Sequence, residues 1–322
     1  MKTYSECIRT PSQIQFPELF SFSCSAQQLH ELQASVLSYG KLNLHNQKKP
    51  RTLWADQLSK LTLPKYYFCH FYVIGLATSV ICLIEMLAWT QYNKPLLLIS
   101  LLQRFDNDVG SRHLSLRQCT VGFTLMTIHL IRRVYESFLV ERPSKTATMH
   151  FSHYLIGVGF YGAMVLGTWL EGASNFEIWS HQSARYDNES QRDGSFENIT
   201  MVFSILLFLY ATYHQYRCHS ILASLRQKSS ASTETTAISK NGYSIPKGDW
   251  FDILVTPHYF ADILIYVSLN ILYHFNNYIF LCGLIWTIVN LSITANETKQ
   301  WYVRHFQNAF PKDRYRIIPG CY

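Results

Sequence analysis

The chain has 322 residues, of which 48% are hydrophobic, 15% aromatic and only 15% charged. A soluble domain carries about 25% charged residues, and a disordered chain combines low hydrophobicity with high charge, so the composition fits neither class. The eight cysteines are scattered, which excludes a disulfide-rich secreted fold. The net charge of +7 comes with no zinc-finger spacing or basic helix, so we expect no nucleic-acid partner. The class that remains is an integral membrane protein.

Apolar runs that approach the length of a bilayer crossing occur at six places along the chain. From them we predict an all-α, multi-pass bundle of transmembrane helices, with a seventh, weaker helix in the N-terminal segment 1–65. The membrane-embedded domain is expected to fill residues 66–322. The six predicted spans are Tyr67–Trp89, Leu114–Ile131, Phe151–Leu170, Ile199–Tyr216, Ile253–Tyr273 and Asn277–Ala295.

Lys and Arg are unevenly divided between the loops, and this bias sets the expected orientation. They are frequent before the first span, after the second and fourth spans, and in the C-terminal tail. The loop 173–197 instead has five acids against Arg185 and Arg192, and two glycosylation sequons, at Asn188 and Asn198, accompany it. We therefore predict that both termini face the cytosol and that this loop faces the lumen.

Gly157, Gly159 and Gly162 form the pattern GVGFYG, which in another context marks a dinucleotide-binding loop. That loop needs a strand before it and a helix after it, whereas this pattern lies inside the apolar run Phe151–Leu170. We interpret the glycines as small residues that let two membrane helices approach closely.

Ionisable residues gather near the span ends that are expected to face the cytosol. Such groups are costly in a membrane and are usually functional. Clustered Arg, Lys and Tyr suit an anionic ligand that bears phosphates, although positive-inside bias alone also explains Arg132, Arg133 and Arg142. The histidines form neither an H-E-x-x-H motif nor a histidine box, so we expect no metal site.

The C-terminal tail carries the most specific pattern, in which Trp301 and Tyr302 precede Phe306, Phe310 and the run Pro311–Pro319. This tail resembles the C-terminal signature of the steroid 5α-reductase family. Within that family the chain resembles the polyprenol reductase branch, because further segments match in order and spacing over residues 38–322. The longest of these segments are IHLIRRVYES (128–137), HQYRCHSILASLR (214–226) and IPKGDWFDILVTPHYFADILIY (245–266).

The resemblance implies an NADPH-dependent reductase of the endoplasmic reticulum membrane. It would saturate the α-isoprene double bond of a long-chain polyprenol or polyprenal, giving the dolichol series that protein N-glycosylation requires. The resemblance also implies that NADPH binds from the cytosolic side, mainly to the region 199–322. The residues that it assigns to the cofactor are Arg133, His219, Arg226, His258, Tyr259, Asp262, Tyr302 and Arg314.

Two positions depart from the family pattern. Thr298 and Lys299 stand just before the Trp–Tyr pair, where relatives often carry a histidine, so Lys299 would replace that histidine as a point charge. Asp262 stands in place of the usual glutamate and is one methylene shorter.

The chemistry of the reaction indicates which form of the lipid reacts. A hydride adds readily to a carbon–carbon double bond only when the bond is polarised, as it is by a conjugated aldehyde and not by an allylic alcohol. We therefore expect polyprenal to be the reactive form. The reaction then needs a donor to the carbonyl oxygen and a source of a proton, for which Tyr39, Tyr135 and Glu136 are the expected catalytic residues.

Other functions fit the sequence pattern as well. One is another membrane lipid enzyme, either a sterol or enoyl reductase or an isoprenylcysteine-type methyltransferase that uses S-adenosylmethionine. The other is a non-catalytic protein that binds or transports lipid and has no cofactor. Binding of NADPH, of S-adenosylmethionine or of neither would distinguish these functions.

Overall fold

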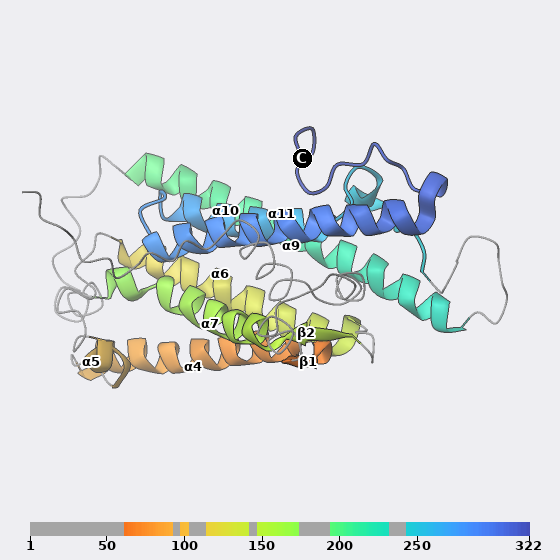
Figure 1. Cartoon of the computed structure of the whole chain (residues 1–322). Helices are drawn as coiled ribbons and strands as arrows, with labels where there is room; N and C mark the ends of the chain where they lie inside the picture. Colours follow the sequence, from red (N-terminus) through yellow and green to blue (C-terminus); the bar gives the residue numbers. More distant parts are fainter. Residues whose placement is uncertain (1–60, 93–96, 103–113, 142–146, 174–193, 232–242) are drawn as a thin grey trace, which may run out of the picture.

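The computed structural model describes residues 61–92, 97–102, 114–141, 147–173, 194–231 and 243–322. Over these ranges the chain is mostly helical, and the long helices lie roughly along one direction (Figure 1). Most of the N-terminal segment 1–65, with its expected seventh helix and Tyr39, falls outside the described residues.

All six predicted spans fall on helices, although their bounds shift. The largest shift is in α9, which continues past the predicted end at Tyr216 and carries Arg217, His219 and Arg226 on one continuous helix. The helices are α4 (Cys69–Tyr92), α5 (Leu97–Leu102), α6 (Leu116–Tyr135), α7 (Phe151–Gly167), α9 (Gly194–Ala231), α10 (Pro257–Leu272) and α11 (Tyr278–Phe306).

Within the described residues, four helical segments are long and apolar enough to cross a membrane. The structure therefore supports a multi-pass helical protein with four of the six predicted spans. The other two predicted spans correspond to α10, which has only 16 residues, and to α6, whose 20 residues include Arg117, Arg132 and Arg133. The four segments are Lys65–Tyr92, Phe151–Gly172, Phe196–Arg226 and Tyr278–Ala309.

The short helix α10 belongs to the interior of the bundle. Ala261, Ile265 and Leu269 are fully buried on it, at the i, i+4 spacing that places residues along one helix face. Its most extensive packing partner is α9, and it also packs against α11. A helix that is covered on several sides by protein can be short, because its length is set by its neighbours rather than by the bilayer.

A two-stranded antiparallel sheet joins the starts of α4 and α7. Strand β1 (Thr62–Pro64) pairs with β2 (Thr148–His150), and each strand leads into its helix, β1 by way of the single turn η2 (Lys65–Phe68). The two helices then pack closely: a Cβ atom at Gly157 would come within 2.5 Å of the Phe71 ring. The expected role of small residues is thus confirmed at Gly157 but is wrong for Gly159 and Gly162, where an added Cβ atom would have no neighbour within 4 Å among the described residues. The three glycines lie inside α7, so they form no dinucleotide loop.

The loop 173–197 ends earlier than predicted, because α9 already begins at Gly194. Asn198 therefore lies in a helix, where its side-chain oxygen accepts a hydrogen bond from Arg117. Only the sequon at Asn188 stays in the predicted loop, and that residue lies outside the described ranges.

The C-terminal tail folds back onto the segment that precedes α10 (Figure 1). Past α11 and the single turn η7 (Gln307–Ala309), Tyr315 forms a bridge with Leu254, and Thr256 donates to the Arg316 carbonyl oxygen at 2.8 Å. Ile317 is fully buried. The tail is therefore a docked part of the fold.

Asn277 connects α11 with α7 at the opposite end of the bundle. Its side-chain oxygen caps α11 by accepting from the Phe280 N–H at 3.0 Å, and its amide donates to the Gly167 carbonyl oxygen of α7 at 2.7 Å. The residue is fully buried, so neither backbone group would regain water if the side chain were lost.

We predict that Asn277→Ala lowers the free energy of unfolding by about 1–3 kcal/mol, because a helix cap and a buried hydrogen bond disappear together. Thermal unfolding in detergent micelles would measure this. The control is Asn276→Ala, since the neighbouring Asn276 is exposed. Equal melting temperatures for the two variants would contradict the prediction.

Candidate active site

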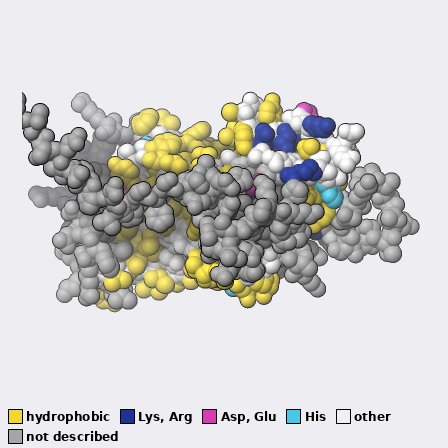
Figure 2. All heavy atoms as spheres, in the orientation of Figure 1, with side chains coloured by type: hydrophobic (Ala, Val, Ile, Leu, Met, Phe, Trp, Pro, Cys, Tyr) yellow, Lys and Arg dark blue, Asp and Glu magenta, His cyan; other side chains and the backbone are white. Residues whose placement is uncertain are grey.

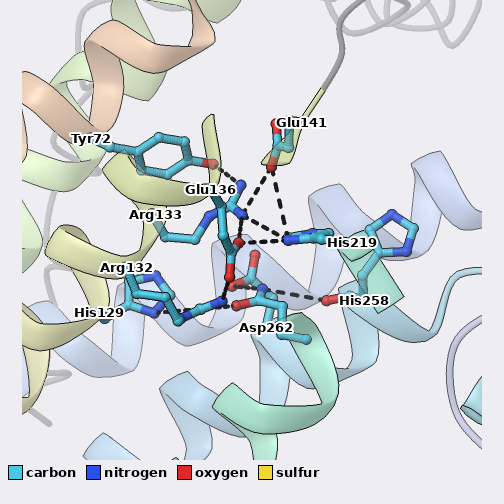
Figure 3. A network of polar contacts seen from close by, with 10 residues as sticks. Tyr72, His129, Arg132, Arg133, Glu136, Glu141, His219, His258 and Asp262 are labelled. Carbon is cyan, nitrogen blue, oxygen red and sulfur yellow. Dashed lines mark hydrogen bonds and ion pairs between the residues drawn. The ribbon is translucent and has the colours of Figure 1, made fainter. Parts of the chain in front are cut away.

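A buried cluster of charged side chains forms where α6 ends (Figure 3). The helix passes directly into a wider, π-helical turn, η3 (Glu136–Val140), a deviation that is frequent at functional sites. Glu136, the first residue of this turn, is fully buried. Its two carboxylate oxygens pair with Arg132 and Arg133, and one of them lies 2.7 Å from Nδ1 of His219 on α9.

Arg133 lies at the centre of the cluster. Its guanidinium contacts Glu136, lies 3.0 Å from a Glu141 oxygen, and donates to the hydroxyl of Tyr72 on α4 at 2.6 Å. Nδ1 of His219 is 2.8 Å from the same guanidinium. When Nδ1 of His219 is protonated it can donate to Glu136, and when it is not protonated it can accept from Arg133. The two contacts are therefore alternatives.

Burial and charge act in opposite directions on the two carboxylates. Burial alone would raise the pKa of Glu136, but the contact with His219 and the charges of Arg133 and Arg132 hold that pKa below its ordinary value. The pKa of Glu141 is lowered in the same way, against its burial, mainly by Arg133 and His219. Both groups are therefore carboxylates at neutral pH.

Glu136, Glu141 and His219 have ligand atoms within 4.8 Å of one another, a spacing that suits a metal ion. However, the Arg133 guanidinium already contacts both carboxylates. The positive charge that these acids require is thus provided by the protein itself.

A second layer of contacts ties this cluster to α10. Arg132 donates to the side-chain oxygen of Gln215, and the amide of Gln215 donates to Asp262 at 2.8 Å. Nδ1 of His129 lies 3.3 Å from the Arg132 guanidinium. The ring of His258, one turn before Asp262, is 5.6 Å from the ring of His219. Three helices, α6, α9 and α10, therefore share one polar network (Figure 3).

The tail residues form a neighbouring group. The ring of Tyr302 stacks on Phe310 at 5.2 Å between centroids, and the buried Arg314 donates to the Pro246 carbonyl oxygen at 3.0 Å. Lys299 donates to the carbonyl oxygen of Arg314 at 2.6 Å. The lysine that departs from the family pattern therefore fixes the backbone of a residue assigned to the cofactor.

Arg226 links the two groups electrostatically. It is exposed near the end of α9, and its charge acts on both His258 and Tyr302. Figure 2 shows Lys and Arg side chains gathered where the tail lies, whereas many of the other described side chains that are visible on this face are apolar. This end of the bundle suits an anionic ligand.

Six of the residues assigned to the cofactor thus lie in the two groups. These are Arg133, His219, His258 and Asp262 in the cluster, and Tyr302 and Arg314 beside the tail. Tyr259 follows His258 with its ring 4.3 Å away, and Arg226 acts on both groups.

Of the three expected catalytic residues, two lie within the described structure. Glu136 lies at the centre of the cluster, Tyr135 is 49% exposed, and Tyr39 lies outside the described residues. Tyr72 and Glu141 also contact Arg133, although no sequence motif marks either residue. Tyr72 stands inside an apolar span, where its hydroxyl is an isolated polar group, and Glu141 follows the last helical residue, so neither belongs to a visible motif.

Comparison with known proteins identifies the family of the chain. The profile of the family 3-oxo-5-alpha-steroid 4-dehydrogenase matches residues 163–322, which include α9, α10, α11 and the tail. Polyprenal reductase 2 of Arabidopsis thaliana is 30% identical over 295 residues, which cover 82% of this chain and 83% of that protein. The chain belongs to the steroid 5α-reductase family.

Relatives from animals support the same membership. Polyprenal reductase of Xenopus tropicalis is 28% identical over 90% of this chain and 89% of its own length, and that of Drosophila melanogaster is 26% identical over 87% and 81%. As a member of the steroid 5α-reductase family, the chain is a reductase that acts on a CH–CH bond. This excludes the methyltransferase and the non-catalytic lipid-binding protein.

We predict that Glu136→Gln destabilises the protein by about 3–5 kcal/mol, because it leaves Arg132 and Arg133 buried without their common counter-ion. The control is Glu141→Gln, which should cost less, since the Glu141 side chain is 31% exposed. Denaturation in mixed micelles would measure both, and a smaller loss for Glu136→Gln would contradict the role of Glu136 as the central anion.

The same substitution should change the pH dependence of stability. Because folding lowers the pKa of Glu136, its contribution is present above the ordinary carboxyl range and is lost as the pH falls through the folded pKa. The melting temperature of the wild-type protein should therefore fall on acidification below about pH 4.5, and that of Glu136→Gln should fall less. Parallel melting curves of the two proteins would argue against this assignment.

Proposed function

We propose that the protein reduces the α-isoprene double bond of long-chain polyprenal with NADPH in the membrane of the endoplasmic reticulum. The observation that carries this proposal is that proteins named polyprenal reductase align with more than four fifths of the chain. The product would feed the dolichol series and thereby protein N-glycosylation. The proposed orientation has the C-terminus in the cytosol, where NADPH is available.

The residues present fit a phosphate-bearing dinucleotide. Within the described part of the chain, Nδ1 of His258 and Nε of Arg314 are buried and have no hydrogen-bond partner. Buried polar atoms are normally paired, so these two nitrogens are suited to contact a ligand. The proposed cofactor residues are Arg133, His219, Arg226, His258, Tyr259, Asp262, Tyr302 and Arg314, with no metal ion required.

NADPH would supply a hydride to the β-carbon of the conjugated aldehyde. The residues of the chain then have two tasks: to hold the cofactor phosphates and to stabilise the negative charge that develops on the carbonyl oxygen. The Arg-rich end of the bundle suits the first task. The exposed apolar faces of α4 and α9, with Ile81, Ile84, Leu206 and Leu209, suit a bilayer and a prenyl chain.

Glu136 has a positioning role in this proposal. It is held as a carboxylate by two arginines, and in this state it accepts hydrogen bonds and has no proton to donate. We assign to it the placement of Arg133 and His219 rather than the protonation of the substrate. Tyr135, which is half-exposed, and Tyr39 remain proposed donors on the substrate side.

The proposal is tested with microsomes from cells that lack their own polyprenal reductase and express this chain. Polyprenal, polyprenol and a steroid enone are supplied in parallel with NADPH, and lipid mass spectrometry detects the gain of one H2. We expect the gain from polyprenal alone. Reduction of polyprenol without prior oxidation would contradict the activated-alkene argument, and reduction of the steroid alone would contradict the proposed substrate.

We predict that Arg314→Ala raises the KM for NADPH by about tenfold or more, since a charge-assisted contact is worth roughly 1.5–3 kcal/mol. The KM for polyprenal should change little. The control is Arg304→Ala, because Arg304 is exposed and hydrogen-bonds Gln300 on the same helix. An unchanged KM for NADPH in Arg314→Ala would remove this residue from the cofactor site.

A further inference from the structure

The hydroxyl of Tyr72 is oriented by a single neighbour. Tyr72 lies on α4 and is 6% exposed, and its oxygen accepts a hydrogen bond from the Arg133 guanidinium at 2.6 Å. The guanidinium carbon is also 4.5 Å from the centroid of the Tyr72 ring. Arg133 has no lone pair to offer, so the hydroxyl hydrogen must point elsewhere. Among the described residues no acceptor for it is observed.

This arrangement makes Tyr72 a stronger donor than an isolated tyrosine. A hydroxyl that accepts from a cation is polarised, and it donates more strongly in turn. The charge of Arg133 also compensates negative charge on the phenol oxygen while Tyr72 shares or gives up its proton. Because Glu136 and Glu141 hold Arg133 from the other side, the guanidinium cannot turn away from Tyr72.

The surroundings of Tyr72 favour charge stabilisation. Its ring meets the ring of Tyr161 on α7 edge-on, with centroids 5.0 Å apart, and Tyr161 is itself buried. A donor that is fixed in an environment with little water stabilises a developing oxyanion more than the same donor in water. Arg133, in turn, contacts His219, which is assigned to the cofactor. Arg133 is itself assigned to the cofactor, so Tyr72 directly contacts the proposed cofactor site.

We propose that Tyr72 is a catalytic residue that donates its hydroxyl hydrogen to the carbonyl oxygen of an α,β-unsaturated aldehyde, and that Arg133 and Glu136 position it. This inference rests on the proposed function. It assigns the task of carbonyl donor to a residue on α4, whereas the sequence analysis placed this task with Tyr39, Tyr135 or Glu136.

The step balances in electrons and protons. The β-carbon gains the hydride from the reduced nicotinamide cofactor, the alkene pair moves to join the α-carbon to the carbonyl carbon, and the carbonyl pair moves to oxygen. Tyr72 holds this oxygen by its hydrogen bond or protonates it. The α-carbon then takes a proton that derives from water, the aldehyde re-forms, and a proton that Tyr72 gave to the oxygen returns to Tyr72. The net change is the addition of one hydride and one proton.

The test uses the full-length enzyme in nanodiscs with NADPH and polyprenal. We expect Tyr72→Phe to lower kcat about 10²–10³-fold, the usual effect of losing one oxyanion donor. The dissociation constant for NADPH, measured by fluorescence, should stay within about twofold, since the ring and its packing remain. The isotope effect with deuterated NADPH should rise, because hydride transfer becomes limiting.

The matched control is Tyr273→Phe. Tyr273 is also a fully buried tyrosine, and its hydroxyl donates to the Thr168 carbonyl oxygen at 3.0 Å at the other end of α10. Removing this hydroxyl should lower the melting temperature and leave kcat and the isotope effect unchanged. A kcat for Tyr72→Phe as high as that of the control would overturn the assignment of Tyr72.

A second measurement does not depend on folding of the Phe variant. Incorporating 3-fluorotyrosine at Tyr72 preserves its shape and makes the phenol more acidic, so the basic limb of the kcat–pH profile should move to lower pH. An unmoved profile in an active enzyme overturns the proposal. If the wild-type enzyme reduces a steroid enone and not polyprenal, the proposed substrate fails, and the same pair of variants then decides on Tyr72 with that enone.

Discussion

The ion pairing of Glu136 with Arg132 and Arg133 is the interaction on which the rest of this structure depends. One buried carboxylate holds two arginines that point in different directions. Arg133 reaches Tyr72 on α4, and Arg132 reaches α10 through Gln215 and Asp262. The wider turn at the end of α6 places Glu136 where it can hold both. Removing this carboxylate would take from both buried arginines the counter-ion that they share and leave Arg133 with Glu141 alone, a change that is strongly destabilising in a protein interior.

Much of the helical architecture could be predicted from the sequence, because a bilayer demands long apolar runs and these are visible without any tertiary information. Apolar runs predict the ends of a helix poorly where the helix contacts protein instead of lipid. The helix α10 is covered by other helices and is therefore shorter than a span, and α9 continues past its apolar stretch because its polar end packs on protein. An apolar run alone does not distinguish lipid from protein as the neighbour.

Part of the candidate site could also be predicted from the sequence. Motif positions such as His219, His258 and Asp262 do come together in one polar network. Tyr72 and Glu141 could not be found this way, because their importance lies in contacts with Arg133 from distant parts of the chain. Lys299 departs from the family pattern, and its role could not be predicted from that pattern. In the structure its side chain donates to the carbonyl oxygen of Arg314.

The docked tail has a consequence for biosynthesis. The backbone N–H groups of Ile317 and Ile318 donate to the carbonyl oxygen of Tyr322, and Tyr315 bridges to Leu254. Arg314 follows Pro246 by 68 residues, so its contact with the Pro246 carbonyl oxygen can form only after α10 and α11 have been synthesised. The proposed cofactor site is therefore completed late in folding, and a chain that stopped before Arg314 would lack this contact.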